Sequence, residues 1–194
     1  MLLPGKAFLL MINKELFERC KKNDSRAQRA LYDSFKGKLM GLCRRYARNR
    51  EDAKDMLQES FIKIFSKITQ VESAGKLENW MKSVAVHTAI DHYHRLKKNE
   101  MANYSGNEYE VAGDGYEVII KELSDEFLIS IISELPEGCR IVFNLFEVEG
   151  YSHAEIGKIL NINEGTSRSQ LYHAKHLLKQ KLNRLGIKHY EKFA

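Results

Sequence analysis

The stretch from Tyr151 to Lys175 constrains the fold more than any other part of this 194-residue chain. Ser152, followed three residues later by Glu155, forms the pattern of a capping box that begins a short helix. The tripeptide Asn161-Ile162-Asn163 ends that helix and supplies an N-cap for the next one. A short helix, a tight turn and a second helix are the parts of a helix-turn-helix.

The second helix of this pair has one side to bury and one side that is polar and basic. Four residues recur at i, i+4, i+7 and i+11 and are predicted to face the core: Ser167, Leu171, Ala174 and Leu178. The other side carries groups that donate hydrogen bonds to phosphates and base edges: Thr166, Arg168, Ser169, Gln170, Tyr172, His173 and Lys175. This pattern predicts a DNA-binding helix, and the alternative for the segment alone is an ordinary helical hairpin with a solvated face.

The distribution of charge supports a polyanionic partner more strongly than the total does. The net charge of +5 alone is weak evidence. Residues 36–54 hold seven Lys and Arg against two acids, and residues 153–194 hold eight against three. Residues 105–137 reverse this balance, with nine acids and one lysine. Two basic bodies joined by an acidic strip favour a clamp on nucleic acid.

The cysteines suggest a reducing compartment, and the apolar run at the N-terminus does not suggest a membrane span. Cys20, Cys43 and Cys139 are odd in number and scattered, so they predict neither a disulfide framework nor a zinc site. The apolar run from Ala7 to Ile12 is too short to cross a bilayer. We interpret Met11 as a plausible alternative start, which would make the first ten residues a disordered extension.

The remaining pattern is helical throughout, because two prolines and twelve glycines leave few signals for strands. Apolar spacing predicts further helices over residues 12–20, 25–46, 52–65, 77–98, 119–133 and 135–146. Between two of them, Ser73-Ala74-Gly75 predicts a flexible loop over residues 69–76.

The predicted fold class is all-α, with two small helical domains joined by a flexible acidic linker and a helix-turn-helix in the second. The expected parts are an extension (1–10), a first domain (11–98), the linker (99–122), a second domain (123–186) and a tail (187–194).

Three segments in this order carry a resemblance to a known family. DAKDMLQESFIKIF (Asp52–Phe65) resembles a polymerase-binding helix, and LENWMKSVAVHTAIDHYHRLKK (Leu77–Lys98) resembles a helix that melts and reads the −10 promoter element. LPEGCRIVFNLFEVEGYSHAEIGKILNINEGTSRSQLYHAKHLLKQKL (Leu135–Leu182) resembles a −35-binding domain. Together they resemble an extracytoplasmic-function (ECF, group IV) sigma factor of the sigma-70 family of bacterial RNA polymerase.

The resemblance implies a role for each matching residue. It implies contacts with the polymerase core for Asp52, Asp55, Gln58 and Glu59. It implies contacts with −10 DNA for Ser73, Lys76, Asn79, Lys82, His87, Asp91, His94, Arg95 and Lys98, with the loop 70–76 holding a flipped-out base. It implies contacts with the −35 duplex for the polar face of the last helix: Thr166, Arg168, Ser169, Gln170, Tyr172, His173 and Lys175.

The sequence departs from the family at a few of these positions. Ser167 stands where the family usually has a buried aliphatic residue, and Leu77 stands where it often has phenylalanine. Histidines at 87, 92 and 94 replace types often seen there. Because of these departures, the promoter sequence that the protein prefers cannot be deduced from its own sequence. Trp80, which shares its spacing with Leu77, is expected to anchor the core rather than to stack on a base.

Two other classes of function compete with this interpretation. His87, Asp91 and His94 share a helical face and resemble part of a metal site, but neighbouring cations such as Arg95 would repel a metal ion. We therefore predict no metal, no cofactor and no catalytic residue. The more serious alternative is a stand-alone helix-turn-helix regulator with a helical sensor domain, which would bind duplex DNA without polymerase, usually as a dimer.

The resemblance also implies the partners and the location. They are the RNA polymerase core, promoter DNA and an anti-sigma protein that is often membrane-bound, with no small-molecule substrate. The protein is expected to be cytoplasmic and monomeric when free.

Overall fold

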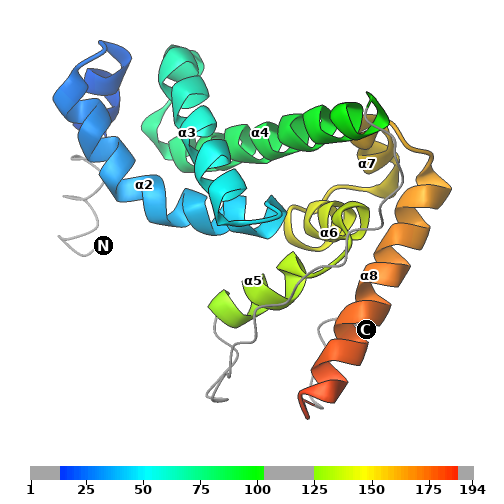
Figure 1. Cartoon of the computed structure of the whole chain (residues 1–194). Coiled ribbons are helices and arrows are strands. Elements are labelled where there is room, and N and C mark those ends of the chain that lie inside the picture. The colour runs from blue at the N-terminus through cyan, green and yellow to red at the C-terminus, as the bar shows by residue number, and fades with distance from the viewer. Residues whose placement is uncertain (1–13, 103–124, 188–194) are drawn as a thin grey trace, which may run out of the picture. The chain divides into compact units, whose positions relative to one another are not determined.

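The computed structural model describes residues 14–102 and 125–187, and these residues form helices, turns and short loops without a strand (Figure 1). The fold class predicted from the sequence is confirmed as all-α. The predicted extension, the start at Met11, most of the linker and most of the tail lie outside the described residues. None of the described helices is long and apolar enough to cross a membrane.

The contacts divide the chain into two compact units, one of residues 1–43 with 49–92 and one of residues 44–48 with 93–194. The first unit is built on a helix over residues 14–21 and on three longer elements and a single turn: α2 (Ser25–Tyr46), α3 (Arg50–Lys67), η1 (Ile68–Gln70) and α4 (Ala74–Ala102). α2 and α4 each continue beyond this unit into residues assigned to the second.

Side-chain caps explain where the helices of the first unit begin. Asp24 accepts hydrogen bonds at Oδ1 from the backbone N–H groups of Arg26 and Ala27, at 2.9 and 3.1 Å, at the start of α2. Asn49 does the same for α3, with its Oδ1 2.9 Å from the backbone N of Asp52. The core beneath is apolar and fully buried, and its largest side chains are Phe17, Leu31, Leu39, Ile64, Ile68 and Met81.

The structure corrects the sequence prediction at both ends of α4. The predicted loop over residues 69–76 is wrong for residues 74–76, because α4 already begins at Ala74. Gly75 is compatible with a helix end and does not by itself require a loop. At its other end α4 runs to Ala102, four residues into the stretch predicted as linker. Trp80, which was expected to anchor the core, is half-buried.

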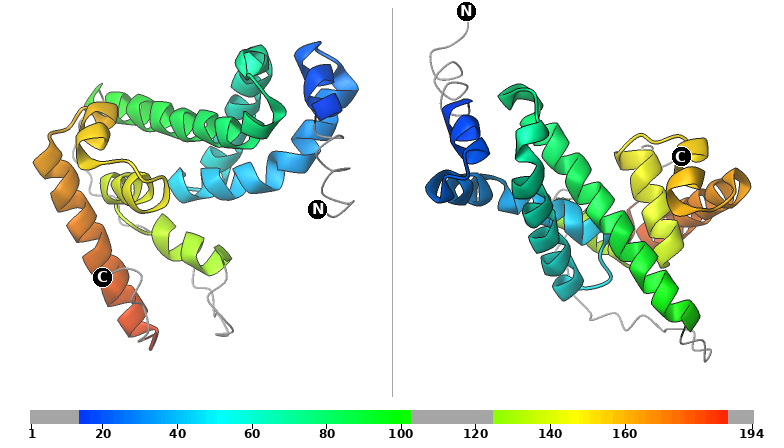
Figure 2. Two further views of the ribbon diagram at one scale, coloured as in Figure 1. Left: turned by 180° about the vertical axis from the view of Figure 1, so that it is seen from behind. Right: turned by 90° about the horizontal axis from the view of Figure 1, so that it is seen from above.

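The second unit contains the helix-turn-helix. Its elements are α5 (Asp125–Ser133), α6 (Glu137–Phe143), the π-helical turn η2 (Asn144–Val148), α7 (His153–Leu160) and α8 (Glu164–Arg184). α8 packs against α6, α7 and α5. Two further views show the course of its ribbon (Figure 2). The core includes Phe143, Leu145, Ile156, Leu160 and Leu178.

Both predicted caps of the helix-turn-helix are present. Ser152 and Glu155 form the capping box, with the backbone N of Ser152 2.8 Å from Glu155 Oε2. Asn163 Oδ1 accepts from the backbone N of Thr166 at 2.7 Å and so begins α8. Between them Asn161 takes a left-handed conformation with φ of 53°, which ends α7 and turns the chain.

Candidate protein-binding and nucleic-acid interfaces

The first candidate interface is the exposed polar side of α3. Asp55 and Gln58 are exposed, whereas Asp52 and Glu59 are half-buried. The residues lie at helical spacing opposite the buried stripe of α3, so they share one side of it. This surface presents carboxylates and an amide, which are suited to basic and hydrogen-bonding groups of another protein.

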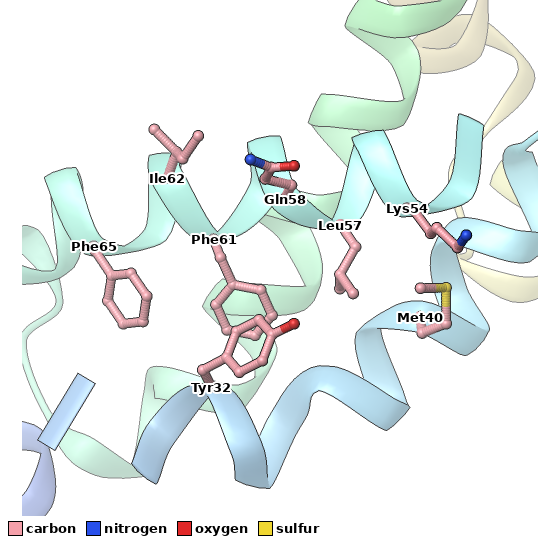
Figure 3. Close-up of a pocket in the computed structure, with 8 residues that line it drawn as sticks. All are labelled: Tyr32, Met40, Lys54, Leu57, Gln58, Phe61, Ile62 and Phe65. Atoms are coloured by element: carbon pink, nitrogen blue, oxygen red, sulfur yellow. The ribbon is translucent and has the colours of Figure 1, made fainter. Parts of the chain in front are cut away.

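An apolar groove lies beside this polar side, between α2 and α3 (Figure 3). It is lined by Tyr32, Met40, Lys54, Leu57, Gln58, Phe61, Ile62 and Phe65. The rings of Tyr32 and Phe61, 4.7 Å apart, join the two helices at its floor. Ile62 stands at its edge with 63% of its surface exposed. Sequence reasoning missed Ile62, although its position out of phase with the buried stripe of α3 was a usable signal.

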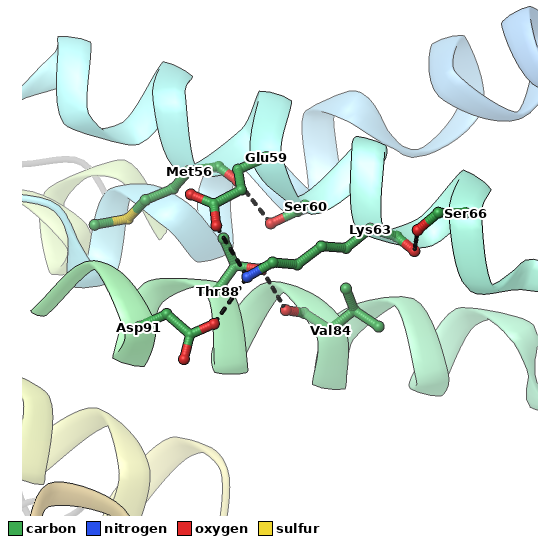
Figure 4. Close-up of polar contacts among 8 residues, drawn as sticks. All are labelled: Met56, Glu59, Ser60, Lys63, Ser66, Val84, Thr88 and Asp91. Atoms are coloured by element: carbon green, nitrogen blue, oxygen red, sulfur yellow. Dashed lines mark hydrogen bonds and ion pairs between the residues drawn. The ribbon is translucent and has the colours of Figure 1, made fainter. Parts of the chain in front are cut away.

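Glu59 is not free on this surface, because it shares a cation with α4 (Figure 4). Lys63 Nζ lies 2.9 Å from Glu59 Oε1 and 2.8 Å from Asp91 Oδ2. Burial lowers the pKa of Lys63, but the two carboxylates outweigh burial and the net effect is a raised pKa. The lysine therefore stays charged and ties a predicted protein-binding residue to a predicted DNA-binding one.

The second candidate interface is a polar stripe along α4. Six of the nine residues predicted to contact −10 DNA recur near multiples of 3.6 residues and share one side of the helix: Lys76, Asn79, His87, Asp91, His94 and Lys98. All six are exposed except His94, which is half-buried. Ser73, also exposed, precedes the helix.

The other two predicted −10 residues lie off this stripe. Lys82 faces Glu78, at 3.3 Å, and Glu78 also pairs with Lys38 of α2 at 3.1 Å. Hydrogen bonds from Lys38 and Lys82 lower the pKa of Glu78. Lys82 thus belongs to a salt-bridge cluster that joins α2 and α4. Arg95 is exposed, about a quarter-turn from the stripe.

Two of the three side chains that suggested a metal site have other partners. Asp91 pairs with Lys63, and Nδ1 of His87 lies 2.7 Å from the backbone oxygen of Ser83. In the described parts of the chain no group of three or more His, Cys, Asp or Glu side chains is placed to hold a metal ion.

The third candidate interface is the outer side of α8. Ser167, Leu171, Ala174, Leu178 and Leu182 are buried, which confirms the predicted inner side. Of the seven predicted −35 residues, four are exposed and three are half-buried. The exposed ones are Arg168, Ser169, Tyr172 and His173, and the half-buried ones are Thr166, Gln170 and Lys175. Tyr172 is the most prominent, with 76% of its surface exposed.

Several of these side chains have partners within the same unit. Arg168 pairs with Glu164 on its own helix, and Lys175 Nζ lies 3.0 Å from Glu147 Oε1. Gln170 lies so close to Gly138 of α6 that a Cβ there would come 2.7 Å from Gln170 Nε2. Gln170 therefore packs beside α6 as well as lining the outer side of α8.

A contact that the sequence did not predict joins α7 to α8. Nδ1 of His153 lies 2.9 Å from Oγ of the buried Ser167, and the His153 ring stacks on Phe146 with centroids 4.4 Å apart. Burial, followed by the charge of Arg168, lowers the pKa of His153. The Ser167 hydroxyl is therefore hydrogen-bonded at a position where an aliphatic residue was expected. Its partner His153 lies near it only in the folded structure.

Comparisons with known proteins match both units. The family description "Sigma-70 region 2" matches residues 31–99, and "Sigma-70, region 4" matches residues 128–178. The "ECF RNA polymerase sigma-E factor" of Haemophilus influenzae is 28% identical over 185 residues, which cover 90% of this chain and 97% of that protein. The "ECF RNA polymerase sigma factor SigW" of Bacillus subtilis is 29% identical over 186 residues, covering 90% and 99%.

A solved structure described as "Structure of CnrH in complex with the cytosolic domain of CnrY" covers 89% of this chain and 97% of its own, with a TM-score of 0.46 and 16% identity. So distant a likeness does not bear on the interfaces. The sequence relatives, by contrast, match almost from end to end, and the two matched regions follow the order of the helices that carry the three interfaces.

Proposed function

Since the chain belongs to the extracytoplasmic-function class of the sigma-70 family of RNA polymerase sigma factors, we propose a role in initiation for each of its three interfaces. As a sigma factor it directs RNA polymerase core to promoters and has no catalytic activity of its own. The polar side of α3 docks on the core enzyme, the stripe on α4 holds the melted −10 strand, and the outer side of α8 reads the −35 duplex.

Docking on the polymerase is supported by the exposed polar side of α3, which lies next to an apolar groove. Asp55 and Gln58 are exposed, and Ile62 adds a large apolar side chain beside them. Protein interfaces commonly combine an apolar contact with a polar surround. A basic, partly apolar helix of the core enzyme fits this combination.

The stripe on α4 suits single-stranded DNA because it mixes cations with groups that bind bases. Lys76 and Lys98 attract phosphates, while His87 and Asn79 offer hydrogen bonds and a ring. Trp80 is half-buried, so the uncovered part of its ring is available to stack on a base in addition to the packing role expected from its spacing. The short link at 71–73, rather than the longer predicted loop, is where a flipped-out base would be held.

The outer side of α8 suits the major groove of duplex DNA. Arg168, Ser169 and Tyr172 stand exposed on the first turns of the helix, where a recognition helix makes its base contacts. The N-terminus of α8 at Thr166 favours a phosphate. Contacts of this kind make binding strongly dependent on salt.

The family also suggests how the protein is controlled. ECF sigma factors generally have anti-sigma factors, and we propose such a partner, membrane-bound in many cases, for this chain. Because the polymerase acts in the cytoplasm, we place the protein there. We expect it to be monomeric when free.

Size-exclusion chromatography with bacterial core RNA polymerase tests the proposal directly. The wild type should co-migrate with core in a one-to-one complex, and Gln58→Ala/Glu59→Ala should weaken that complex. The matched control is Ser66→Ala/Lys67→Ala, a double change of two exposed residues at the end of the same helix, which should bind as the wild type does.

Two results would contradict the proposal. Equal binding by the Gln58/Glu59 variant and the control would remove the α3 surface from docking. Failure of the wild type to bind core, together with a stable free dimer that shifts duplex DNA, would favour the stand-alone regulator instead.

A further inference from the structure

Lys63 lies between α3 and α4, and its ammonium group forms ion pairs with two carboxylates on different helices. Its Nζ lies 2.9 Å from Glu59 and 2.8 Å from Asp91 (Figure 4). The side chains of Lys63 and Glu59 are 28% and 29% exposed, whereas Asp91 is 57% exposed and reaches the surface. The cluster therefore carries one net negative charge, held partly out of solvent.

The groups next to this cluster do not compete for the lysine. Ser60 and Thr88, both fully buried, lie between α3 and α4. Ser60 donates to the backbone oxygen of Met56 at 2.6 Å, and Thr88 donates to that of Val84 at 2.9 Å. Their hydroxyls are used within their own helices, so Glu59 and Asp91 are the partners that hold Lys63 in place.

We propose that Lys63 is a positioning residue for capture of the −10 strand, which acts by holding Asp91 and offsetting its charge. This inference rests on the proposed function of the α4 stripe. Asp91 lies in that stripe among His87, His94 and Lys98. An unpaired carboxylate there would repel the phosphates of the strand, whereas a carboxylate paired with Lys63 repels them much less and keeps one oxygen to accept a hydrogen bond from a base.

Glu59, the other carboxylate that Lys63 contacts, connects the offset of the Asp91 charge to polymerase binding. Glu59 belongs to the surface that docks on the core enzyme. If a cation of that enzyme pairs with Glu59, Lys63 pairs with Asp91 only. The α4 stripe is then less negative in the holoenzyme than in the free protein. For this reason the measurement that tests Lys63 uses the assembled holoenzyme.

The experiment compares Lys63→Met, Asp91→Asn and the double variant in binding a fluorescent −10 single strand to holoenzyme formed at saturating core. Lys63→Met should weaken binding about fivefold, since it leaves a carboxylate without its counter-ion. Lys63→Met/Asp91→Asn should bind within about twofold of Asp91→Asn itself, because the carboxylate of the α4 stripe that Lys63 offsets is then neutral. The Lys63→Met defect should also shrink as salt rises from about 50 to about 300 mM.

Controls separate this role from loss of fold and from failure of the proposed function. Lys67→Met removes the same charge from an exposed position on the same helix and should bind as the wild type does. Lys63→Gln is the second neutral variant, for which the same rescue by Asp91→Asn is expected. A double variant as weak as Lys63→Met, or a defect that does not change with salt, would overturn the proposal. A wild type that forms no holoenzyme would instead overturn the proposed function.

Discussion

Replacement of Gly157 by leucine tests how closely α7 and α8 must approach each other. Gly157 is buried in α7, and a Cβ at this position would lie 2.9 Å from the backbone oxygen of Ile162. It would also lie 3.7 Å from the backbone N of Glu164, the first residue of α8. These are backbone atoms of the turn, so a longer side chain can be accommodated only if the turn moves and takes the start of α8 with it.

The expected magnitude follows from two opposing terms. Overpacking of this kind costs about 1–3 kcal/mol. Leucine regains about 0.6–0.8 kcal/mol of helix propensity over glycine. The difference of the two terms is a loss of about 0.2–2.4 kcal/mol. The free energy of unfolding of the second unit should therefore fall by on the order of 1 kcal/mol, which lowers its urea midpoint by about 1 M if its denaturant dependence is about 1 kcal/mol per M.

The same substitution at Gly37 is the matched control. Gly37 is an exposed residue of α2, and a Cβ there would have no atom within 4 Å. Gly37→Leu should gain only the helix propensity and leave the first unit slightly more stable. The two changes thus differ in sign for a reason that lies in packing alone.

Urea titration with two probes can assign each effect to its unit. Trp80 is the only tryptophan and lies in the first unit, so its fluorescence follows that unit, whereas far-UV circular dichroism follows both. Gly157→Leu should move the dichroism transition to lower urea and should weaken binding of a −35 duplex by the holoenzyme. A Gly157→Leu protein as stable as the wild type would show that the turn yields without cost and would refute the reasoning.

Two further predictions concern α8 and the contact between α7 and α8. Arg168→Ala should weaken binding of the −35 duplex to holoenzyme by about 1–2 kcal/mol. This is the lower end for a residue that pairs with guanine, because Arg168 must first leave Glu164. The control Glu164→Gln should bind at least as tightly as the wild type, and unchanged binding by Arg168→Ala would exclude the contact. Burial and the charge of Arg168 lower the pKa of His153 in the folded protein below its ordinary value of 6.5. As the pH falls, this histidine is therefore protonated in the unfolded chain before it is protonated in the folded one. The free energy of unfolding of the second unit should then decrease as the pH drops through 6.5. Urea midpoints between about pH 7.5 and 5.5 should vary less in His153→Asn than in the wild type, and an equal pH dependence would contradict the assignment to His153.

Local patterns were enough to predict the helix-turn-helix. The capping box at Ser152 and the cap at Asn163 depend on residues within three positions of each other, and both formed as predicted. The inner side of α8 likewise follows from helical spacing, down to the fully buried Ser167. Such features need no knowledge of distant contacts, which is why the sequence alone suffices for them.

Partners from other helices could not be predicted in the same way. Lys63 and Asp91 are 28 positions apart, and nothing in either helix alone pairs them. The link between His153 and Ser167 depends on the angle at which α7 meets α8. The start of α4 was misjudged because serine and glycine within three residues resemble a loop, whereas Gly75 lies in the first turn of a helix. The roles of individual side chains in contacting polymerase and DNA remain predictions.

The cations of α8 lead to a final inference about how the promoter is bound. Arg168 is held by Glu164 and Lys175 by Glu147, so duplex phosphates or base edges must displace carboxylates before they gain either cation. Each exchange replaces one ion pair by another, so the net gain in binding free energy is smaller than for a cationic side chain that has no ion-pair partner before binding. We therefore expect the isolated protein to bind −35 duplex weakly. Attachment to polymerase raises the effective concentration of the helix at the promoter, so that weak contacts at two elements together become selective.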